Sequence, residues 1–464
     1  MLVAFGMIGT SLSGVTFVSV PGDVGTSHFN YFQLTLGYFF GYLVIAYVLL
    51  PLYYKMNLTS IYSFLEQRLG VSAHKAGAVF FIVSRTVGAT ARLYLVINIL
   101  QLFLLDDLNI PFYVTTLVIL SMILLYTFEG GVKTIVYTDT LQTTAMLLGL
   151  GICIVVITKA MNTDLSGMWQ IMQAKGHTEI FNWDAKSGGN FFKQFIGGMF
   201  ITITMTGLDQ EMMQKNISVK TLGNSQKNMI TMASILIVVI FSFLFLGGLL
   251  YTYAEAKGIT ATGDDIFPTI ALKDSISGTI SVIFIIALIS ALFPSVDGAI
   301  TSLTSCYCID ILNFKNLNID EKAKKKKRLA VHLTFAVIFF LMVLLFKVID
   351  DKSIIQFIIK FAGITYGPLL GLFAFGILTK RSIKGKNVWP VCIAGPLITV
   401  FIDMLCNPAY YEARLGTKLG LDGVSESIFH GYKIGPELIL INGLIVFLGL
   451  FLISGKNTAN HAHH

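Results

Sequence analysis

Predominantly apolar segments of 18 or more residues recur along the whole chain. Each is long enough to cross about 30 Å of hydrocarbon as an α-helix. Charged residues make up only 13% of the 464 residues, whereas about a quarter is usual in soluble domains. The apolar runs are continuous rather than alternating, which excludes a transmembrane β-barrel. The sequence therefore predicts an all-α polytopic membrane protein.

About twelve transmembrane helices are predicted, and the basic residues of the connecting loops orient them. The segments are 1–20, 30–53, 76–104, 110–128, 134–159, 190–212, 227–254, 277–310, 329–349, 354–379, 387–405 and 434–453. One set of loops carries most lysines and arginines, including Lys55, Lys215 and the run 322–328. The positive-inside rule places this set in the cytoplasm. Alternating spans put all these loops on one side, which supports the count.

Three soluble stretches complete the predicted organisation. The run 322–328 is interpreted as a solvated cytoplasmic loop, in preference to a lipid-headgroup or nucleic-acid patch, so no nucleic-acid partner is expected. The external segments 160–190 and 406–433 are long enough to hold short helices over the mouth of the protein. No soluble domain is predicted.

The eighth segment, 277–310, holds a proline and a lone acid near its middle. A carboxylate at the bilayer centre costs roughly 2.5–3.5 kcal/mol, so Asp297 needs a cation, a proton or an arginine beside it. Pro294 cannot donate to the carbonyl of Ser290 and leaves that oxygen free. Ser295 adds a hydroxyl, and hard oxygen ligands suit an alkali cation. The segment favours an ion or substrate pathway over a helix-packing salt bridge.

Polar groups also interrupt the first and fifth segments. Residues 6–17, GMIGTSLSGVTF, concentrate glycines and hydroxyls, and such a run can unwind and offer backbone carbonyls to a cation. Close helix packing through small residues is the alternative. In the fifth segment, Asp139 and Gln142 share a helix face, about two turns from the cytoplasmic end. Asp139 either faces the interior or lies at the membrane interface.

The third segment carries two arginines, Arg85 and Arg92, seven residues apart on one face. At the α-helical rise they lie about 15 Å and about 25 Å from the cytoplasmic end. A charge layer of Arg85, Asp139 and Asp297 is therefore geometrically allowed. The arginines either hold a solute carboxylate through bidentate bonds or neutralise the two aspartates, and both alternatives stay open.

Several segments resemble the sodium:solute symporter family. GGVKTIVYTDTLQ (130–142) looks like its signature, and GITYGPLLGLFAFGILTKR (363–381) is similar to its glycine-proline helix. SLSGVTFVSVPG (11–22) resembles its first core helix, and NLTSIYSFLEQRLG (57–70) its following cytoplasmic loop. DQEMMQKNISVKT (209–221) is similar to the end of its sixth helix. The resemblance runs in order over essentially the whole chain.

The resemblance implies the five-plus-five inverted-repeat fold of the leucine transporter, with broken first and sixth core helices and alternating access. The repeats are expected in 1–159 and 190–380, followed by two additional helices in 381–455 and a tail in 456–464. Family members normally carry one more helix before the broken one. The first repeat is therefore expected to be truncated at its N-terminus.

The resemblance also implies sodium sites between the first, fifth and eighth helices. The main Na⁺ site falls on Gly9, Leu12, Ala291 and Ser295. A second site, present in some members, falls on Asp139 and Asp297. The eighth helix departs from the family pattern: Pro294 stands at a usual hydroxyl position, and Asp297 and Gly298 stand where serines are usual. Asp297 is therefore expected to be a relocated cation ligand.

The solute-binding residues are expected to be Ser13, Thr16, Arg85, Arg92 and Gln142. Ser13 and Thr16 follow from the resemblance of the first helix. Arg85 matches the position of an arginine at the substrate site in the sialic-acid branch of the family. The buried arginines favour an anionic solute, while neutral sugars remain open.

The predicted function is secondary active transport: Na⁺-coupled symport of a sugar, a sugar acid such as sialic acid, or a carboxylate. The alternatives are an H⁺-coupled transporter or a membrane solute sensor with the same fold. An aspartyl protease with Asp139 and Asp297 as its dyad is disfavoured, so no enzyme is predicted. No organic cofactor is expected, and the chain is expected to act as a monomer in a bacterial inner membrane.

Overall fold

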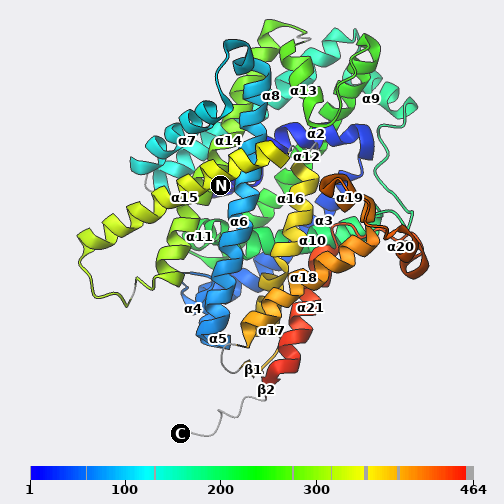
Figure 1. Ribbon diagram of the computed structural model, residues 1–464. Coiled ribbons are helices and arrows are strands. Elements are labelled where there is room, and N and C mark those ends of the chain that lie inside the picture. Colours follow the sequence, from blue (N-terminus) through cyan, green and yellow to red (C-terminus); the bar gives the residue numbers. More distant parts are fainter. Residues whose placement is uncertain are drawn as a thin grey trace, which may run out of the picture.

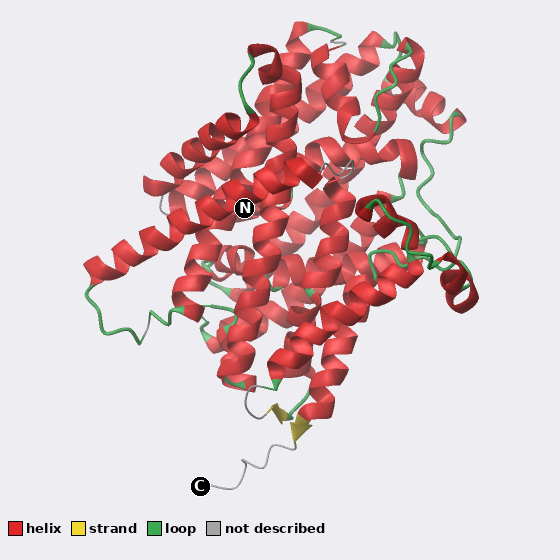
Figure 2. Cartoon of the chain, viewed as in Figure 1, coloured by secondary structure: helices red, strands yellow, loops and turns green. Residues whose placement is uncertain are grey.

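The computed structural model describes residues 2–58, 60–129, 132–273, 276–314, 316–349, 354–383 and 387–455. These residues form a bundle of helices (Figure 2). The strands among them are β1 (Ser382–Ile383) and β2 (Ser454–Gly455), which pair antiparallel. The predicted tail, 456–464, lies outside the described residues.

Seven helical segments of the described chain are long and apolar enough to cross a membrane. They are Tyr31–Met56, Val71–Leu108, Thr138–Ala160, Leu222–Lys257, Gly278–Ile311, Glu321–Val348 and Val388–Cys406. Their α-helices are α3 (Tyr31–Val44), α4 (Leu50–Met56), α6 (Val71–Leu100), α8 (Val132–Ala160), α12 (Leu222–Lys257), α14 (Gly278–Cys306), α15 (Glu321–Ile349) and α18 (Val388–Cys406). Single π-helical turns follow α3, α6 and α14 as η1 (Ile45–Leu49), η2 (Gln101–Leu105) and η7 (Tyr307–Ile311).

Three further spans are helix pairs bent at a short break. The first joins α1 (Leu2–Ser11) to α2 (Gly14–Ser27) with a bend of 56°. The second runs through α10 (Phe191–Thr202) and η4 (Ile203–Gly207) into α11 (Gln210–Ile217) with a bend of 68°. These two bends confirm the predicted breaks in the first and sixth helices. The third, 45° between α16 (Ile354–Thr365) and α17 (Gly367–Leu378), was not predicted.

Shorter helices complete the bundle. The apolar stretch Phe112–Leu125 of α7 (Phe112–Glu129) and α21 (Leu438–Ile453) are the remaining apolar helices of the described chain. With them, the twelve predicted segments all have a helical counterpart. The remaining helices are α5 (Ser63–Leu69), η3 (Asp106–Leu108), α9 (Leu165–Ala174), η5 (Gly263–Asp265), α13 (Ile266–Pro268), η6 (Thr269–Lys273), α19 (Pro408–Leu415) and α20 (Asp422–Phe429). Helices α9, α19 and α20 confirm the short helices predicted in the long external segments.

One local prediction is wrong. The run 322–328 is not a loop, because α15 begins at Glu321 and the lysines form its first two turns. Figure 1 shows this end of α15 projecting from the side of the bundle. The eighth span is one continuous helix: α14 runs through Pro294 from Gly278 to Cys306. A single proline removes only one backbone donor, and the helix continues on both sides of it.

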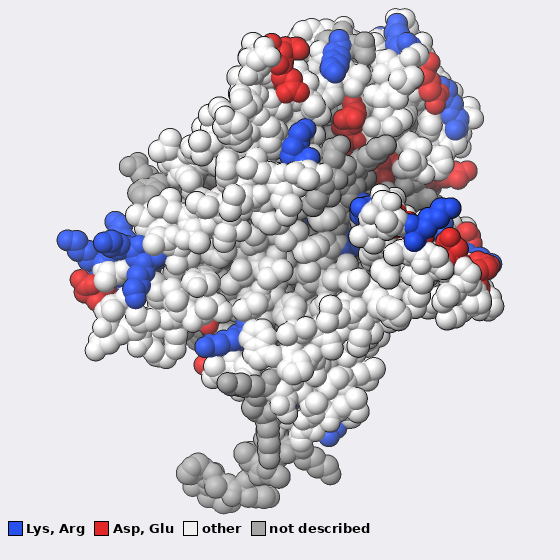
Figure 3. All heavy atoms as spheres, viewed as in Figure 1, with Lys and Arg blue, Asp and Glu red and all other residues white. Residues whose placement is uncertain are grey.

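On the face drawn in Figure 3, charged side chains gather in a few places. Figure 3 shows them at the top, at the left where α15 begins, and at the right around α19 and α20. The surface between these places is almost free of charge. Large apolar side chains such as Leu125, Val348 and Leu452 are exposed on the surface of the protein. This band suits contact with the hydrocarbon of a bilayer.

Candidate ion and solute site

A cavity of about 140 Å³ lies at the breaks of the first and sixth spans. Its polar lining comes from Thr10, Ser11, Ser13, Thr16, Tyr31, Tyr38, Tyr42, Arg85, Arg92, Thr202 and Thr206. Apolar side chains such as Leu12 and Ile355 complete the wall. The pocket therefore combines hydroxyl and guanidinium groups with an apolar lining, as small-solute sites usually do.

The break between α1 and α2 presents its polar groups to this cavity. Ser13 caps α2 in an extended backbone conformation, and its N–H donates to the Thr16 hydroxyl at 3.3 Å. The hydroxyl of Ser11 is buried without a hydrogen-bond partner among the described residues. Ser13 and Thr16 line the cavity, as the sequence predicts.

The two arginines of α6 have different partners. Arg85 lies within ion-pair distance of two buried acids, Asp209 (Nε to Oδ2, 3.5 Å) and Glu211 (Nη2 to Oε2, 2.5 Å). Arg92 also lines the cavity, and in the described part of the chain no carboxylate is within ion-pair distance of it. Arg85 thus neutralises two protein acids, but these are not the expected Asp139 and Asp297. Arg92 faces the cavity.

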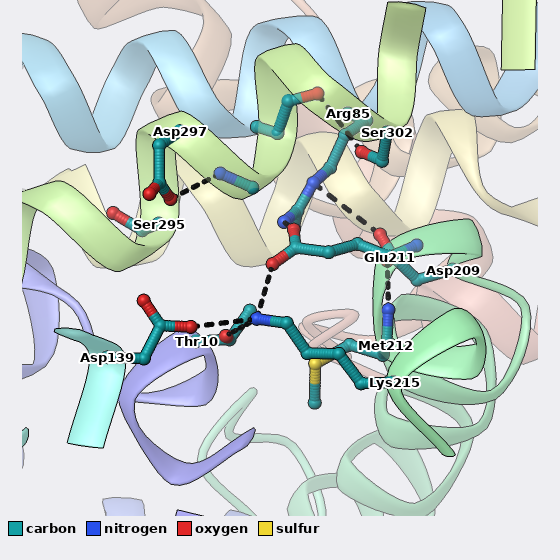
Figure 4. Close-up of polar contacts among 12 residues, drawn as sticks. Thr10, Arg85, Asp139, Asp209, Glu211, Met212, Lys215, Ser295, Asp297 and Ser302 are labelled. Carbon is teal, nitrogen blue, oxygen red and sulfur yellow. Dashed lines mark hydrogen bonds and ion pairs between the residues drawn. The ribbon is translucent and has the colours of Figure 1, made fainter. Parts of the chain in front are cut away.

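A buried cation lies beside Asp139. The ammonium of Lys215, on α11, is 3.0 Å from Asp139 Oδ2 and 3.1 Å from Glu211 Oε1, and donates to Thr10 Oγ1 at 2.7 Å (Figure 4). Lys215 is 6% exposed, so its assignment to a cytoplasmic loop is wrong. The second bend turns α11 back into the protein, and this carries the lysine inward.

Asp297 lies on α14 beside this cluster and is fully buried. Its Oδ1 accepts the backbone N–H of Gly298, and its Oδ2 has no partner among the described residues. Asp139 Oδ1 is likewise buried and unpartnered there. In Figure 4 both carboxylates face the gap between α8 and α14. Two buried carboxylate oxygens, Asp139 Oδ1 and Asp297 Oδ2, thus lack a partner in the described chain. Such oxygens favour binding of a cation or a proton.

The charges of the cluster do not balance. Four buried acids, Asp139, Asp209, Glu211 and Asp297, face two buried bases, Arg85 and Lys215. If all six groups are ionised, the four acids carry two more charges than the two bases of the cluster. Buried charges are normally paired, so the arrangement favours uptake of positive charge.

The backbone expected to form the main Na⁺ site lies next to these acids. A side chain at Gly9 would place its Cβ 2.2 Å from Thr143 Oγ1 and 3.2 Å from the Asp139 carbonyl oxygen, so α1 lies directly against α8. Leu12 is at the break and is buried. Ser295, one turn from Ala291 on α14, donates to the Leu292 carbonyl at 2.9 Å. Its oxygen keeps lone pairs for a cation.

Gly298 and Gln142 lie outside the lining of the cavity. At Gly298 a Cβ would lie 2.0 Å from Glu211 Oε1, so the missing side chain leaves room for that carboxylate against α14. Gln142 does not line the cavity of about 140 Å³. Its Oε1 is buried and has no partner in the described chain.

Sequence reasoning missed three members of the cluster: Asp209, Glu211 and Lys215. All lie in the segment 209–221, which the family resemblance had drawn attention to. The available signal was an acid and a lysine four residues apart, Glu211 and Lys215, directly after an apolar span. Such pairs are common on exposed helices, and only the bend shows that this one is buried.

An outer chamber of about 300 Å³ lies next to the cavity, sharing Tyr31, Ile355 and Ile359 with it. Its polar lining includes Gln356 and Lys360. The shared residues place the chamber and the cavity side by side.

The segment η5, a single 3₁₀ turn in the loop after α12, packs against α2. Burial raises the pKa of Asp264 to about 7, although hydrogen bonds from Ser19 and from the backbone N–H of Ile354 lower it. The latter bond, 3.3 Å long, joins η5 to the first residue of α16. At Gly22 a Cβ would lie 2.3 Å from the Gly263 carbonyl oxygen. The loop therefore depends on a close backbone contact with α2.

Comparison with known proteins identifies the family of this chain. The profile of the sodium:solute symporter family matches residues 1–388, more than half of the chain. The chain belongs to the sodium:solute symporter family. It is thus an integral membrane transporter rather than an enzyme, which confirms those two predictions.

Individual relatives in the family differ in the solute they are named for. The chain is 24% identical to the sodium/sialic acid symporter SiaT of Proteus mirabilis over 453 residues, 94% of this chain and 84% of that protein. It is 26% identical to the sodium-coupled monocarboxylate transporter 1 of Mus musculus over 394 residues, 81% of this chain and 62% of that protein. Both solutes in these names are carboxylic acids.

The fold agrees with that of a solved symporter. A Na⁺-coupled sialic acid symporter in a substrate-bound, outward-open state superposes with a TM-score of 0.78. The match covers 98% of this chain and 91% of the other at 18% identity. It confirms the predicted fold class. The division into two inverted repeats, 1–159 and 190–380, with additional helices in 381–455, stays a prediction.

Proposed function

We propose that this symporter carries a small organic anion, a sugar acid such as sialic acid or a short carboxylate, together with Na⁺. The observation that carries the proposal is Arg92, a cavity-lining guanidinium that has no protein carboxylate within ion-pair distance among the described residues. A guanidinium binds a carboxylate with two parallel hydrogen bonds. A solute anion would supply the direct ion-pair partner that the described residues do not provide there.

The cavity lining supports a polar body for that solute. Hydroxyls of Ser13 and Thr16 and phenols such as Tyr42 surround the space beside Arg92. These groups both donate and accept hydrogen bonds, as sugar hydroxyls require. The named acids carried by two relatives, sialic acid and monocarboxylates, are consistent with this chemistry.

The proposed cation sites lie on the cytoplasmic side of the same breaks. One Na⁺ is held by backbone carbonyls of Gly9 and Leu12 with Ala291 and the Ser295 hydroxyl. A second lies between the unpartnered oxygens of Asp139 and Asp297. Oxygen donors of both kinds suit a hard monovalent cation. We further propose that the chain acts as a monomer in a bacterial plasma membrane.

Solute binding by the purified protein is the first test. Sialic acid, other sugar acids and short carboxylates are screened by thermal shift with and without Na⁺. A ligand that binds the folded state raises the melting temperature by mass action. The proposal predicts the largest shift when an acid and Na⁺ are present together, and a smaller shift when K⁺ replaces Na⁺.

Uptake by proteoliposomes then identifies the driving ion. An inward Na⁺ gradient is expected to drive accumulation of the acid found in the screen, whereas a pH gradient in sodium-free buffer is not. Accumulation driven by the pH gradient alone would instead assign protons to Asp139 and Asp297. Equal uptake of the acid and its neutral amide would overturn the assignment of an anionic solute.

A further inference from the structure

Lys215 lies in surroundings that resemble a cation site. Its ammonium contacts three oxygens: the Thr10 hydroxyl at 2.7 Å, Asp139 Oδ2 at 3.0 Å and Glu211 Oε1 at 3.1 Å. An ammonium has three N–H donors, so these contacts use all of them. The oxygens come from α1, α8 and α11. Figure 4 shows the group enclosed between these elements.

A surface role does not account for this lysine. Lysine is strongly hydrated and is almost never fully buried unless it is paired. Lys215 is 6% exposed, and the oxygens around it belong to Thr10 at 5%, Asp139 at 0% and Glu211 at 5%. Burying an ammonium is offset only where several oxygens replace its water. The three oxygens thus stabilise one buried positive charge at this point.

The two carboxylate oxygens of Asp139 differ in their partners. Asp139 Oδ2 faces the ammonium, whereas Oδ1 has no partner in the described chain and neither has Asp297 Oδ2. With four acids and two bases in the cluster, Lys215 supplies one charge that a mobile cation would otherwise have to supply.

We infer that Lys215 is a tethered cation that occupies one cation position of the cluster and thereby limits how many free cations accompany the solute. The inference rests on the proposed cation-coupled transport. The ammonium holds the half-helices α1 and α11 to α8 from within, at the place where the free cation reaches the other oxygen of Asp139. The lysine thus determines the ion stoichiometry of the symporter.

The decisive substitution is Lys215→Met. Methionine is one heavy atom shorter than lysine, so its methyl group ends near the lysine Cε and leaves the ammonium position open among the three oxygens. Na⁺ is expected to fill that position. The charge moved per solute, measured from reversal potentials in proteoliposomes, should rise by about one, and the Na⁺ dependence of uptake should steepen accordingly, as linkage requires.

Matched variants separate charge from structure. Lys215→Arg keeps the charge and should keep the wild-type stoichiometry. Lys220→Met removes an exposed lysine from the same segment and should change neither quantity. If Lys215→Met does not fold, the double variant Glu211→Gln with Lys215→Met restores the wild-type net charge of the cluster. It should then show the wild-type stoichiometry.

A second readout does not depend on transport. The melting temperature of Lys215→Met should be lower than that of the wild type without Na⁺ and should rise more steeply with Na⁺ concentration. Unchanged stoichiometry and Na⁺ dependence in Lys215→Met, or a raised stoichiometry in the double variant, would overturn the inference. Loss of Na⁺-driven uptake in the wild type would count against the proposed function, and the Na⁺ titrations would still decide the role of the lysine.

Discussion

Replacing Arg92 by glutamine is expected to weaken binding of the anionic solute without weakening the fold. The guanidinium lines the cavity and has no carboxylate partner in the described chain, so its removal leaves no buried protein charge unpaired. Arg85→Gln is the matched contrast. It would leave the buried acids Asp209 and Glu211 without their cation.

The two losses differ in size and in kind. A hydrogen bond to a charged group contributes roughly 1.5–3 kcal/mol, and each ~1.4 kcal/mol is tenfold in affinity. Arg92→Gln should therefore raise the KM and Kd for the acid by about 10- to 150-fold. Breaking one partner out of a buried ion pair costs about 3–5 kcal/mol of stability, so Arg85→Gln should lower the melting temperature before any solute is added.

The assay pairs the acid with its neutral amide. Solute-induced thermal shifts and uptake KM values are measured for both solutes in the wild type and the two variants. The wild type should prefer the acid, and Arg92→Gln should lose that preference while keeping its melting temperature. An unchanged acid preference in Arg92→Gln would refute the reasoning, as would a solute-free melting temperature of Arg85→Gln equal to that of the wild type.

Three other substitutions probe the cation cluster, the outer loop and the packing of α1. Asp297→Asn should reduce the Na⁺-dependent rise in melting temperature while the protein still folds, because only one of the two proposed cation sites uses this carboxylate, and an unaltered Na⁺ titration would contradict its role as a ligand. Because burial raises the pKa of Asp264 to about 7, the folded state holds a proton that the unfolded state releases above about pH 4. The stability contribution of Asp264 is therefore present at low pH and is lost as the pH rises toward 7, and Asp264→Asn should flatten the melting temperature over that window. Gly9→Ala should lower the free energy of unfolding by about 1–3 kcal/mol, since its Cβ would meet Thr143 Oγ1 at 2.2 Å, and the second substitution Thr143→Ala should restore most of the loss.

The span pattern was predictable because membrane insertion depends on properties that are local in the sequence. A run of apolar residues, such as 227–254, must form a helix in lipid whatever its neighbours are, since every backbone group must be satisfied within the segment. The break at 11–13 was also predictable, because glycine and hydroxyl residues weaken a helix over a few positions. The third bend, before Pro368, has a similar local signal in its glycine and proline residues. The resemblance to a glycine-proline helix was noted there, but no bend was predicted from it.

The sequence by itself determined the class of protein and the presence of buried charges such as Arg92, Asp139 and Asp297, since charges inside apolar runs are costly. Only the tertiary structure decided which charges meet. A bend of 68° turns Lys215 from an expected loop position into the interior, and it pairs Arg85 with acids other than Asp139. Charge pairing depends on distances of a few ångströms between separate helices, and that information is absent from the order of residues along any one of them.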